Sequence, residues 1–261
     1  MNSEQINGSS DGRPEISAPP IPKGHLLLVE DHDINQILIK AMTEELGYHT
    51  ELAVDGAEAV AWIDSALSAN SPIDLVLMDL QMPVMDGFEA TRMIRASGVS
   101  EKSLPIVAIT ANADQADIDR CFAAGMQGHI AKPIMMDILE KVVEQTISRV
   151  SPKTSEAPRP VKKNQFSDEL NNRYANRRDQ AIRSLTGLIQ VGTFLDHELA
   201  EVSGQLHKLA GTAAMFGEPE LGTQAKKIED GIRSWSRSER ADKIADHADI
   251  LFSIAQTEGY I

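Results

Sequence analysis

The chain has 261 residues, enough for two modest domains that each bury a core. Its formal net charge of −14 argues against nucleic acid as a direct partner, because phosphate binding needs a basic surface. The single cysteine, Cys121, excludes an internal disulfide and fits a reducing compartment. No apolar run approaches the ~20 residues of a membrane span, and the polar start lacks a signal-peptide core. We therefore expect a soluble, cytoplasmic protein without a membrane partner.

Two polar segments divide the chain. Residues 1–23 are rich in Ser, Gly, Pro and Asn and are predicted to be a disordered lead-in. Residues 151–165 carry three prolines among polar residues and are predicted to be a flexible linker. About 15 linker residues span at most roughly 50 Å when fully extended. The expected domains are therefore residues 24–150 and 166–261.

In the first domain, short apolar runs alternate with amphipathic helical patterns. The runs are residues 26–29, 52–54, 75–78, 106–109 and, more weakly, 129–131. Strands that alternate with helices predict a parallel sheet with helices on both faces. The expected fold class of this domain is a doubly wound, five-stranded α/β fold.

Polar residues and glycines indicate where these helices begin and end. Asp33 is placed to N-cap the first helix, and Gly47 to end it. Asp55, followed three residues later by a glutamate, resembles a capping box for the second helix. Asp86 is expected to cap the third helix, and Gly87 to permit the turn before it.

The second domain shows no strand pattern. From about residue 166 to 258, four or five helices are predicted, with breaks near Gly192, Gly217 and Ser236. This pattern indicates an all-α helical bundle.

Chemically reactive residues follow four strands of the first domain. Glu30 and Asp31 end the first strand, Asp79 the third, Thr110 the fourth and Lys132 follows the fifth. In an open α/β sheet the carboxyl ends of the strands form the ligand-binding edge, so these residues are expected on one rim. Clustered carboxylates repel one another unless a cation lies among them, and oxygen ligands suit Mg²⁺. The expected chemistry is phosphoryl transfer to a carboxylate nucleophile, with Mg²⁺ and Lys132 neutralising charge.

Four segments, LLLVEDH, MDLQMPVMDG, IVAITAN and HIAKPI, together resemble the response-regulator receiver domain over about residues 24–148. The resemblance implies a flavodoxin-like sheet in which Asp79 accepts the phosphoryl group. It also implies that Thr110 and Lys132 contact that group.

The same resemblance implies a magnesium site. Asp31 and Asp79 would be ligands, the backbone carbonyl of Gln81 would join them, and Glu30 would act through water.

One histidine of the second domain is distinguished by its helix. A 3-4-3-4-3 spacing of apolar residues marks the buried stripe, formed by Leu199, Val202, Leu206, Leu209, Ala213 and Phe216. His207 points roughly 130° away from the centre of that stripe. Its neighbours on that side are small and include Gly204 and Gly211, although glycine inside a helix costs about 1 kcal/mol relative to alanine. Small neighbours would leave the ring accessible to a bulky partner.

The segment QLHKLAGTAAMFG resembles the histidine phosphotransfer (HPt) domain, whose signature is His, then Leu two residues on, then Gly four residues on. The resemblance extends more weakly over residues 166–258. Where that family often has lysine, this chain has Ala210. Lys208, Lys226 or Lys227 could supply the positive charge instead, or could be ordinary solvated lysines.

Together the two resemblances imply a two-component phosphorelay protein. A sensor histidine kinase would donate to Asp79, and His207 would exchange phosphoryl groups with Asp79 or with a separate receiver. The chain has no recognisable nucleotide-binding or kinase region, so we expect it not to be an ATP-using enzyme.

Three alternatives stay open. The chain could be the C-terminal part of a hybrid histidine kinase, although a polar start from Met1 suggests a complete chain. It could be a phosphate-sink receiver with a degenerate helical interaction domain. It could also be a Mg²⁺-dependent phosphohydrolase, but Gln81 occupies the place where a second aspartate would be expected.

Overall fold

The structure is a computed structural model, and it describes residues 21–257 apart from 70, 72, 112–113 and 151–167. The predicted disordered lead-in, except for residues 21–23, and the predicted linker lie outside the described residues. Within the described ranges, no helix has both the length and the apolarity that a membrane span requires.

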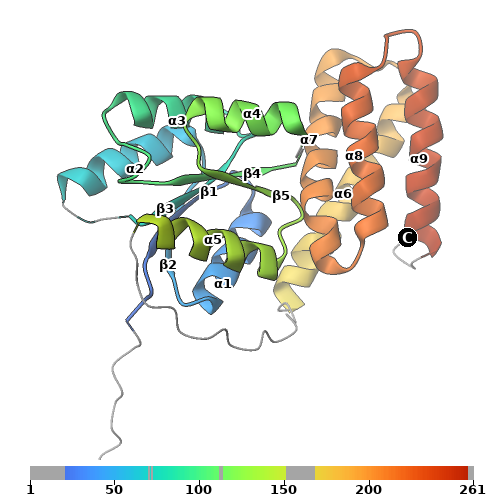
Figure 1. The fold of residues 1–261 in the computed structure, drawn as a ribbon. Helices are drawn as coiled ribbons and strands as arrows, with labels where there is room; N and C mark the ends of the chain where they lie inside the picture. Colours follow the sequence, from blue (N-terminus) through green and yellow to red (C-terminus); the bar gives the residue numbers. More distant parts are fainter. Residues whose placement is uncertain (1–20, 70, 72, 112–113, 151–167, 258–261) are drawn as a thin grey trace, which may run out of the picture.

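The first domain is a five-stranded parallel sheet in the order β2-β1-β3-β4-β5. Its strands are β1 (His25–Val29), β2 (His49–Ala53), β3 (Leu75–Asp79), β4 (Ile106–Thr110) and β5 (Gly128–Ala131). Its helices are α1 (Asp33–Glu45), α2 (Gly56–Ser68), α3 (Gly87–Ala96), α4 (Gln115–Ala124) and α5 (Met136–Val150). Figure 1 shows α2, α3 and α4 on one face of the sheet and α1 and α5 on the other. The predicted flavodoxin-like α/β architecture is confirmed.

The predicted position of β2 was partly wrong. The apolar run at residues 52–54 was expected to form this strand, but β2 begins three residues earlier and is His49–Ala53. Val54 lies outside the strand, with 51% of its surface exposed. Because β2 is an edge strand, its polar residues are tolerated: His49 is exposed, while Thr50 is buried and bonds to the Thr43 hydroxyl across 2.7 Å.

The predicted N-cap position of Asp33 was wrong by one residue, although its Oδ1 accepts from the Ile34 N–H across 2.8 Å. His32 is the N-cap residue of α1, and Asp33 is the first helical residue. The other signals held. Asp55 and Asp86 accept hydrogen bonds from the backbone N–H three residues on, and Gly47, with φ +90°, follows the end of α1.

The second domain is the predicted helical bundle. It comprises α6 (Asp168–Val191), α7 (Asp196–Thr212), the short 3-10 helix η1 (Ala213–Phe216), α8 (Pro219–Ser234) and α9 (Arg240–Thr257). Gly192 and Gly217 have positive φ at the breaks where the sequence placed them. The predicted stripe is buried along α7, but it ends in η1, where Phe216 is only partly buried and stacks on Tyr174.

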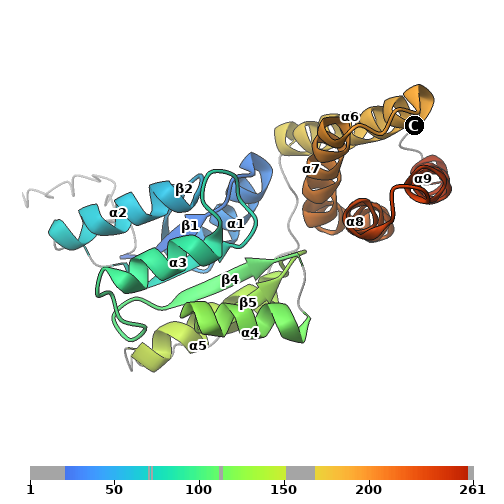
Figure 2. The ribbon, with the colours of Figure 1, turned by 90° about the horizontal axis from the view of Figure 1, so that it is seen from above.

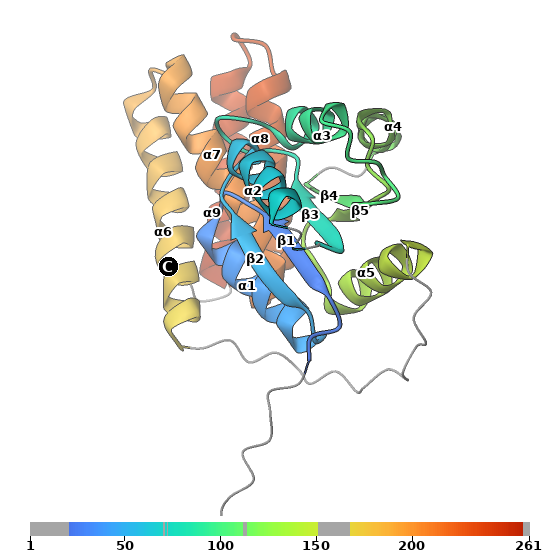
Figure 3. The ribbon, with the colours of Figure 1, turned by 90° about the vertical axis from the view of Figure 1, so that its left-hand side faces the viewer.

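The bundle stands at the end of the sheet to which the strands point. Figure 2, seen from above, shows the tips of β4 and β5 directed toward α7, and Figure 3 shows the bundle behind the sheet when viewed from the opposite end. Helix α1 contacts both α6 and α7. The bundle therefore lies at the edge of the sheet where parallel α/β folds carry their sites.

Candidate functional site

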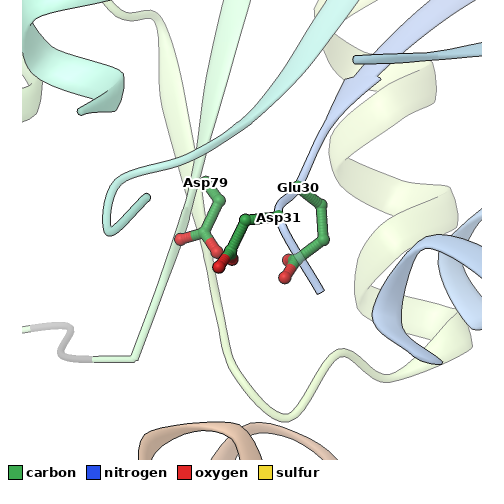
Figure 4. Close-up of side chains that lie close together, drawn as sticks. All are labelled: Glu30, Asp31 and Asp79. Atoms are coloured by element: carbon green, nitrogen blue, oxygen red, sulfur yellow. The ribbon is translucent and has the colours of Figure 1, made fainter. Parts of the chain in front are cut away.

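Three carboxylates converge at the carboxyl ends of β1 and β3. Glu30 and Asp31 follow β1 and Asp79 ends β3; one oxygen from each lies within 4.8 Å of the others. Figure 4 shows the three side chains directed toward one another. β1 and β3 are paired neighbours, which explains why two sequence segments about 50 residues apart deliver their acids to one place.

Lys132 bridges two of these acids. Its Nζ lies 2.9 Å from Glu30 Oε2 and 2.6 Å from Asp79 Oδ2, and its side chain is only 5% exposed. Asn35 Nδ2 donates to the other oxygen of Glu30 across 2.9 Å. The predicted association of Lys132 with the carboxylate cluster is therefore present in the structure.

The cluster holds more negative charge than Lys132 balances. Burial, reinforced by the charge of Asp79 and opposed by Lys132, raises the pKa of Glu30 to about 8. Burial and Asp79 also raise the pKa of Asp31, although Lys208, Lys132 and His207 oppose this shift. The pKa of Lys132 is raised as well, because Asp79 and Glu30 outweigh the effect of its burial.

This donor set fits a divalent cation. The ligand atoms are all oxygens and they are close together, and burial raises the pKa of both Glu30 and Asp31, so a bound cation would stabilise their charged forms. Mg²⁺ accepts such a set and keeps waters on its remaining positions.

The other residues predicted for this site lie around Asp79. The Gln81 N–H donates to Asp79 Oδ1 across 3.1 Å; the role of its carbonyl as a ligand stays a prediction. Thr110 is buried at the end of β4, and its carbonyl accepts from the Lys132 N–H at 2.7 Å. Gly87 is required here because a Cβ at this position would collide with the Asp79 carbonyl.

His207 lies on α7 with its side chain 18% exposed. Its Nδ1 is 3.1 Å from Oε1 of Glu229, a residue of α8 whose side chain is fully buried. Arg233 and Lys226 also bind Glu229, at 2.7 and 3.3 Å. Burial would raise the pKa of Glu229, but His207 and these cations lower it below its usual range. Glu229 is therefore a carboxylate acceptor that faces Nδ1, and this favours the tautomer with the proton on Nδ1.

Sequence analysis missed Glu229. The residue lies 22 positions from His207 and on another helix, so helical periodicity gives no signal for the contact.

The three lysines considered for this site differ in their surroundings. Lys226 is bound to Glu229 and to Asp230, at 3.3 and 2.8 Å. Lys208, in contrast, is close enough to Asp31 that its charge lowers the pKa of that carboxyl. Among the described residues, Lys227 forms no ion pair. It lines a pocket between α8 and α9. Lys208 therefore has the position that best suits the predicted positive charge.

Comparisons with known proteins agree with the fold of the first domain. Residues 26–144 match the family model of the response regulator receiver domain. Similar proteins include the hybrid signal transduction protein dokA of Dictyostelium discoideum (36% identical over 145 residues, 56% of this chain and 8% of that protein). Another is the sensor histidine kinase RcsC of Salmonella typhimurium (38% over 125 residues, 48% of this chain and 12% of that protein). The chain thus spans about a tenth of the length of these relatives.

A solved structure is also similar. The receiver domain of the sensor histidine kinase PA1611 of Pseudomonas aeruginosa, described with a magnesium ion in its active-site cleft, is 40% identical, with a TM-score of 0.42. The match covers 48% of this chain and 98% of that one.

The first domain is thus a module of two-component signalling. More particularly, residues 26–144 are a response regulator receiver domain, related to the receivers of hybrid histidine kinases. The family match ends before the bundle.

Proposed function

We propose that this protein is a phosphorelay protein in which Asp79 of the receiver accepts a phosphoryl group and His207 of the bundle carries one. The observation that supports Asp79 is its place in the carboxylate cluster, with Lys132 Nζ 2.6 Å from Oδ2. A carboxylate nucleophile needs its charge balanced as an anionic phosphoryl group approaches, and this is the position of Lys132.

Asp31 and Asp79 would hold Mg²⁺ together with the carbonyl of Gln81, and Glu30 would bind through a water. When bound, the ion supplies charge neutralisation at the transferring phosphoryl group. Lys132 binds Oδ2 of Asp79 at 2.6 Å and is held by Glu30 at 2.9 Å, and Thr110 would hydrogen-bond a phosphoryl oxygen.

His207 suits phosphoryl transfer because its Nδ1 faces the Glu229 carboxylate, which favours a proton on that nitrogen. The Glu229 carboxylate accepts from Nδ1, so the lone pair of Nε2 is available for a phosphorus atom. The ring becomes positively charged when Nε2 bonds to phosphorus, and a buried carboxylate 3.1 Å away stabilises that charge.

The proposed donor is the phosphohistidine of a sensor histidine kinase. The partner of His207 is a receiver aspartate, and the chain itself does not use ATP.

The test supplies a phosphoryl donor with a P–N bond, such as radiolabelled phosphoramidate, to the full chain with Mg²⁺. Asp79→Asn and His207→Gln are compared with the unmodified protein, and the label is assigned by its chemical lability. We expect both an acyl phosphate and a phosphohistidine in the unmodified protein, and only the acyl phosphate in His207→Gln.

Two results would contradict this proposal. If label never reaches His207, even with a second receiver present, the bundle is an interaction module and the receiver a sink. If Asp79→Asn still forms an acyl phosphate, another carboxylate is the acceptor. Label on His207 in the Asp79→Asn protein would show that the bundle can be charged independently.

A further inference from the structure

Helix α1 of the receiver contributes to two apolar cores. Ile39 and Met42 pack against the sheet, in the cluster that also contains residues of β1, β3 and α5. Ile34 and Leu38 belong instead to the apolar core of the bundle and are 0% and 1% exposed. Burying two such side chains removes apolar surface from water and stabilises the contact between the domains.

Charged groups border this apolar contact. Arg177 of α6 donates through Nη2 to Asp33 Oδ1 across 2.7 Å, and Arg173 approaches the same carboxylate at 4.0 Å. Burial alone would raise the pKa of Asp33, but Arg177 lowers it below its usual range. A half-exposed ion pair contributes little energy, so its main effect is to fix which part of α6 faces α1.

The same contact places α7 over the carboxylate cluster. A Cβ added to Gly211 would lie 3.5 Å from Lys132 Cδ and 3.9 Å from Asn35 Nδ2. These are ordinary contact distances, so the backbone of α7 at Gly211 passes directly beside the lysine that binds Asp79. In Figure 4 a helix in the colours of the bundle passes below the three carboxylates.

His207 lies one turn before Gly211 and therefore on the same side of α7. Gly211 lies beside Lys132, whose Nζ is 2.6 Å from Asp79 Oδ2. The side of α7 that carries His207 is therefore the side turned toward the receiver pocket.

We infer that α1 is an intramolecular docking surface for α6 and α7, and that the phosphoryl partner of Asp79 is His207 of the same molecule. This inference rests on the function proposed above. In the transfer, a P–N bond forms at His207 Nε2 and the P–O bond to Asp79 breaks, which restores the carboxylate. The ring keeps its proton on Nδ1 and gains a positive charge beside Glu229.

Docking has a consequence for the charging step. In the docked arrangement the side chains of Asp79 and Lys132 are only 2% and 5% exposed, and α7 lies over them. A bulky donor reaches Asp79 only when the bundle has moved away. Phosphorylation of Asp79 by a separate donor protein and transfer from Asp79 to His207 therefore occur in different arrangements of the two domains.

The concentration dependence of transfer tests this inference. The full chain with Mg²⁺ is charged with radiolabelled phosphoramidate, excess donor is removed, and phosphohistidine is followed at protein concentrations that differ about a hundredfold. We expect one first-order rate constant throughout, because the partners share a chain. An equimolar mixture of Asp79→Asn and His207→Gln chains should transfer more slowly, at a rate that rises with concentration.

The outcomes separate this inference from the function on which it rests. Transfer in the unmodified protein that slows in proportion to dilution would overturn intramolecular docking but leave the relay intact. No phosphohistidine in any sample, including the mixture, would overturn the relay and the docking together.

A charge reversal tests the docking surface itself. Arg177→Glu places like charges opposite Asp33, and we expect it to slow the first-order transfer about threefold to tenfold. Arg183→Glu is the matched control, because Arg183 is an exposed arginine of α6 that forms no ion pair with the residues that the structure describes. Adding Asp33→Arg to Arg177→Glu restores opposite charges and should recover the rate. If Arg177→Glu and Arg183→Glu transfer equally fast, the α1 contact does not guide the transfer.

Discussion

The two domains treat buried acids in opposite ways. In the receiver, three carboxylates lie close together, a single lysine binds two of them, and burial raises the pKa of Glu30 to about 8. In the bundle, Glu229 is bound by a histidine, a lysine and an arginine, and its pKa is lowered. Glu218 is likewise bound by Arg178 and Tyr174. The receiver therefore keeps unbalanced charge for a cation and a phosphoryl group, whereas the bundle uses balanced charge to build structure and orient His207.

This difference can be measured in each domain separately. The chain has two tryptophans, Trp62 on α2 and Trp235 at the end of α8. Replacing one with phenylalanine leaves fluorescence that reports the unfolding of the other domain.

The largest expected change in the free energy of unfolding follows from removing Glu218, a buried acid of the bundle that has charged and polar partners. Glu218 is 3% exposed; its Oε1 lies 2.9 Å from Arg178 Nη1, and Tyr174 donates to its other oxygen. Glu218→Ala leaves a buried guanidinium without its main partner, so we expect the free energy of unfolding to fall by about 3–5 kcal/mol. Denaturant titration followed by Trp235 fluorescence measures it. Glu201→Ala, at an exposed position of α7, should change it by less than about 0.5 kcal/mol, and equal losses would contradict the distinction.

Magnesium should stabilise only the receiver. At a Mg²⁺ concentration of 100 times Kd, binding to the folded state adds about 2.7 kcal/mol to the free energy of unfolding. The shift should appear in the Trp62 signal, be absent from the Trp235 signal, and disappear in Asp31→Asn. A shift that persists in Asp31→Asn would place the ion elsewhere.

Neutralising one acid in each domain should give effects of opposite sign without metal. In EDTA, Glu30→Gln replaces a carboxyl whose burial disfavours its charged form, and we expect the receiver to gain about 1 kcal/mol. Glu229→Gln weakens charged hydrogen bonds, and we expect the bundle to lose about 2 kcal/mol. The same two titrations measure both variants. Destabilisation by Glu30→Gln equal to that by Glu229→Gln would show that the receiver acids are balanced after all.

The smallest effect is the acid sensitivity of the bundle. Because the pKa of Glu229 is lower in the folded than in the unfolded state, the unfolded state binds more protons in acid. The stabilisation is complete above the unfolded glutamate pKa of about 4.3 and is lost as the pH falls through the folded value. The Trp235 transition should therefore weaken less on acidification in Glu229→Gln than in the unmodified protein. Parallel pH profiles would exclude this contribution.

Much of the receiver could be predicted from sequence because its signals are local. Apolar runs located the buried strands, and the residues directly after them located the site, since the carboxyl ends of parallel strands share one edge. The edge strand β2 was misplaced because only two of its five residues, Leu52 and Ala53, are apolar, so its pattern is weaker than that of a buried strand.

Contacts between distant residues could not be predicted. Asp33 was expected to cap its own helix, and its carboxylate accepts from the Ile34 N–H there, but it also bonds to Arg177, 144 positions away. The contact between His207 and Glu229 joins two helices, and Gly211 lies beside Lys132 of the other domain. In each case folding brings together residues that are distant in the sequence, and the spacing of apolar residues along one helix does not predict such a contact.

The most direct test of the relay is phosphorus NMR of the full chain after a short exposure to phosphoramidate with Mg²⁺, because acyl phosphate and phosphohistidine give separate resonances. We predict that the acyl phosphate signal of Asp79 appears first and decays as the phosphohistidine signal of His207 grows. In His207→Gln the acyl phosphate signal should form without this conversion. A phosphohistidine signal that never appears in the unmodified protein would contradict the account.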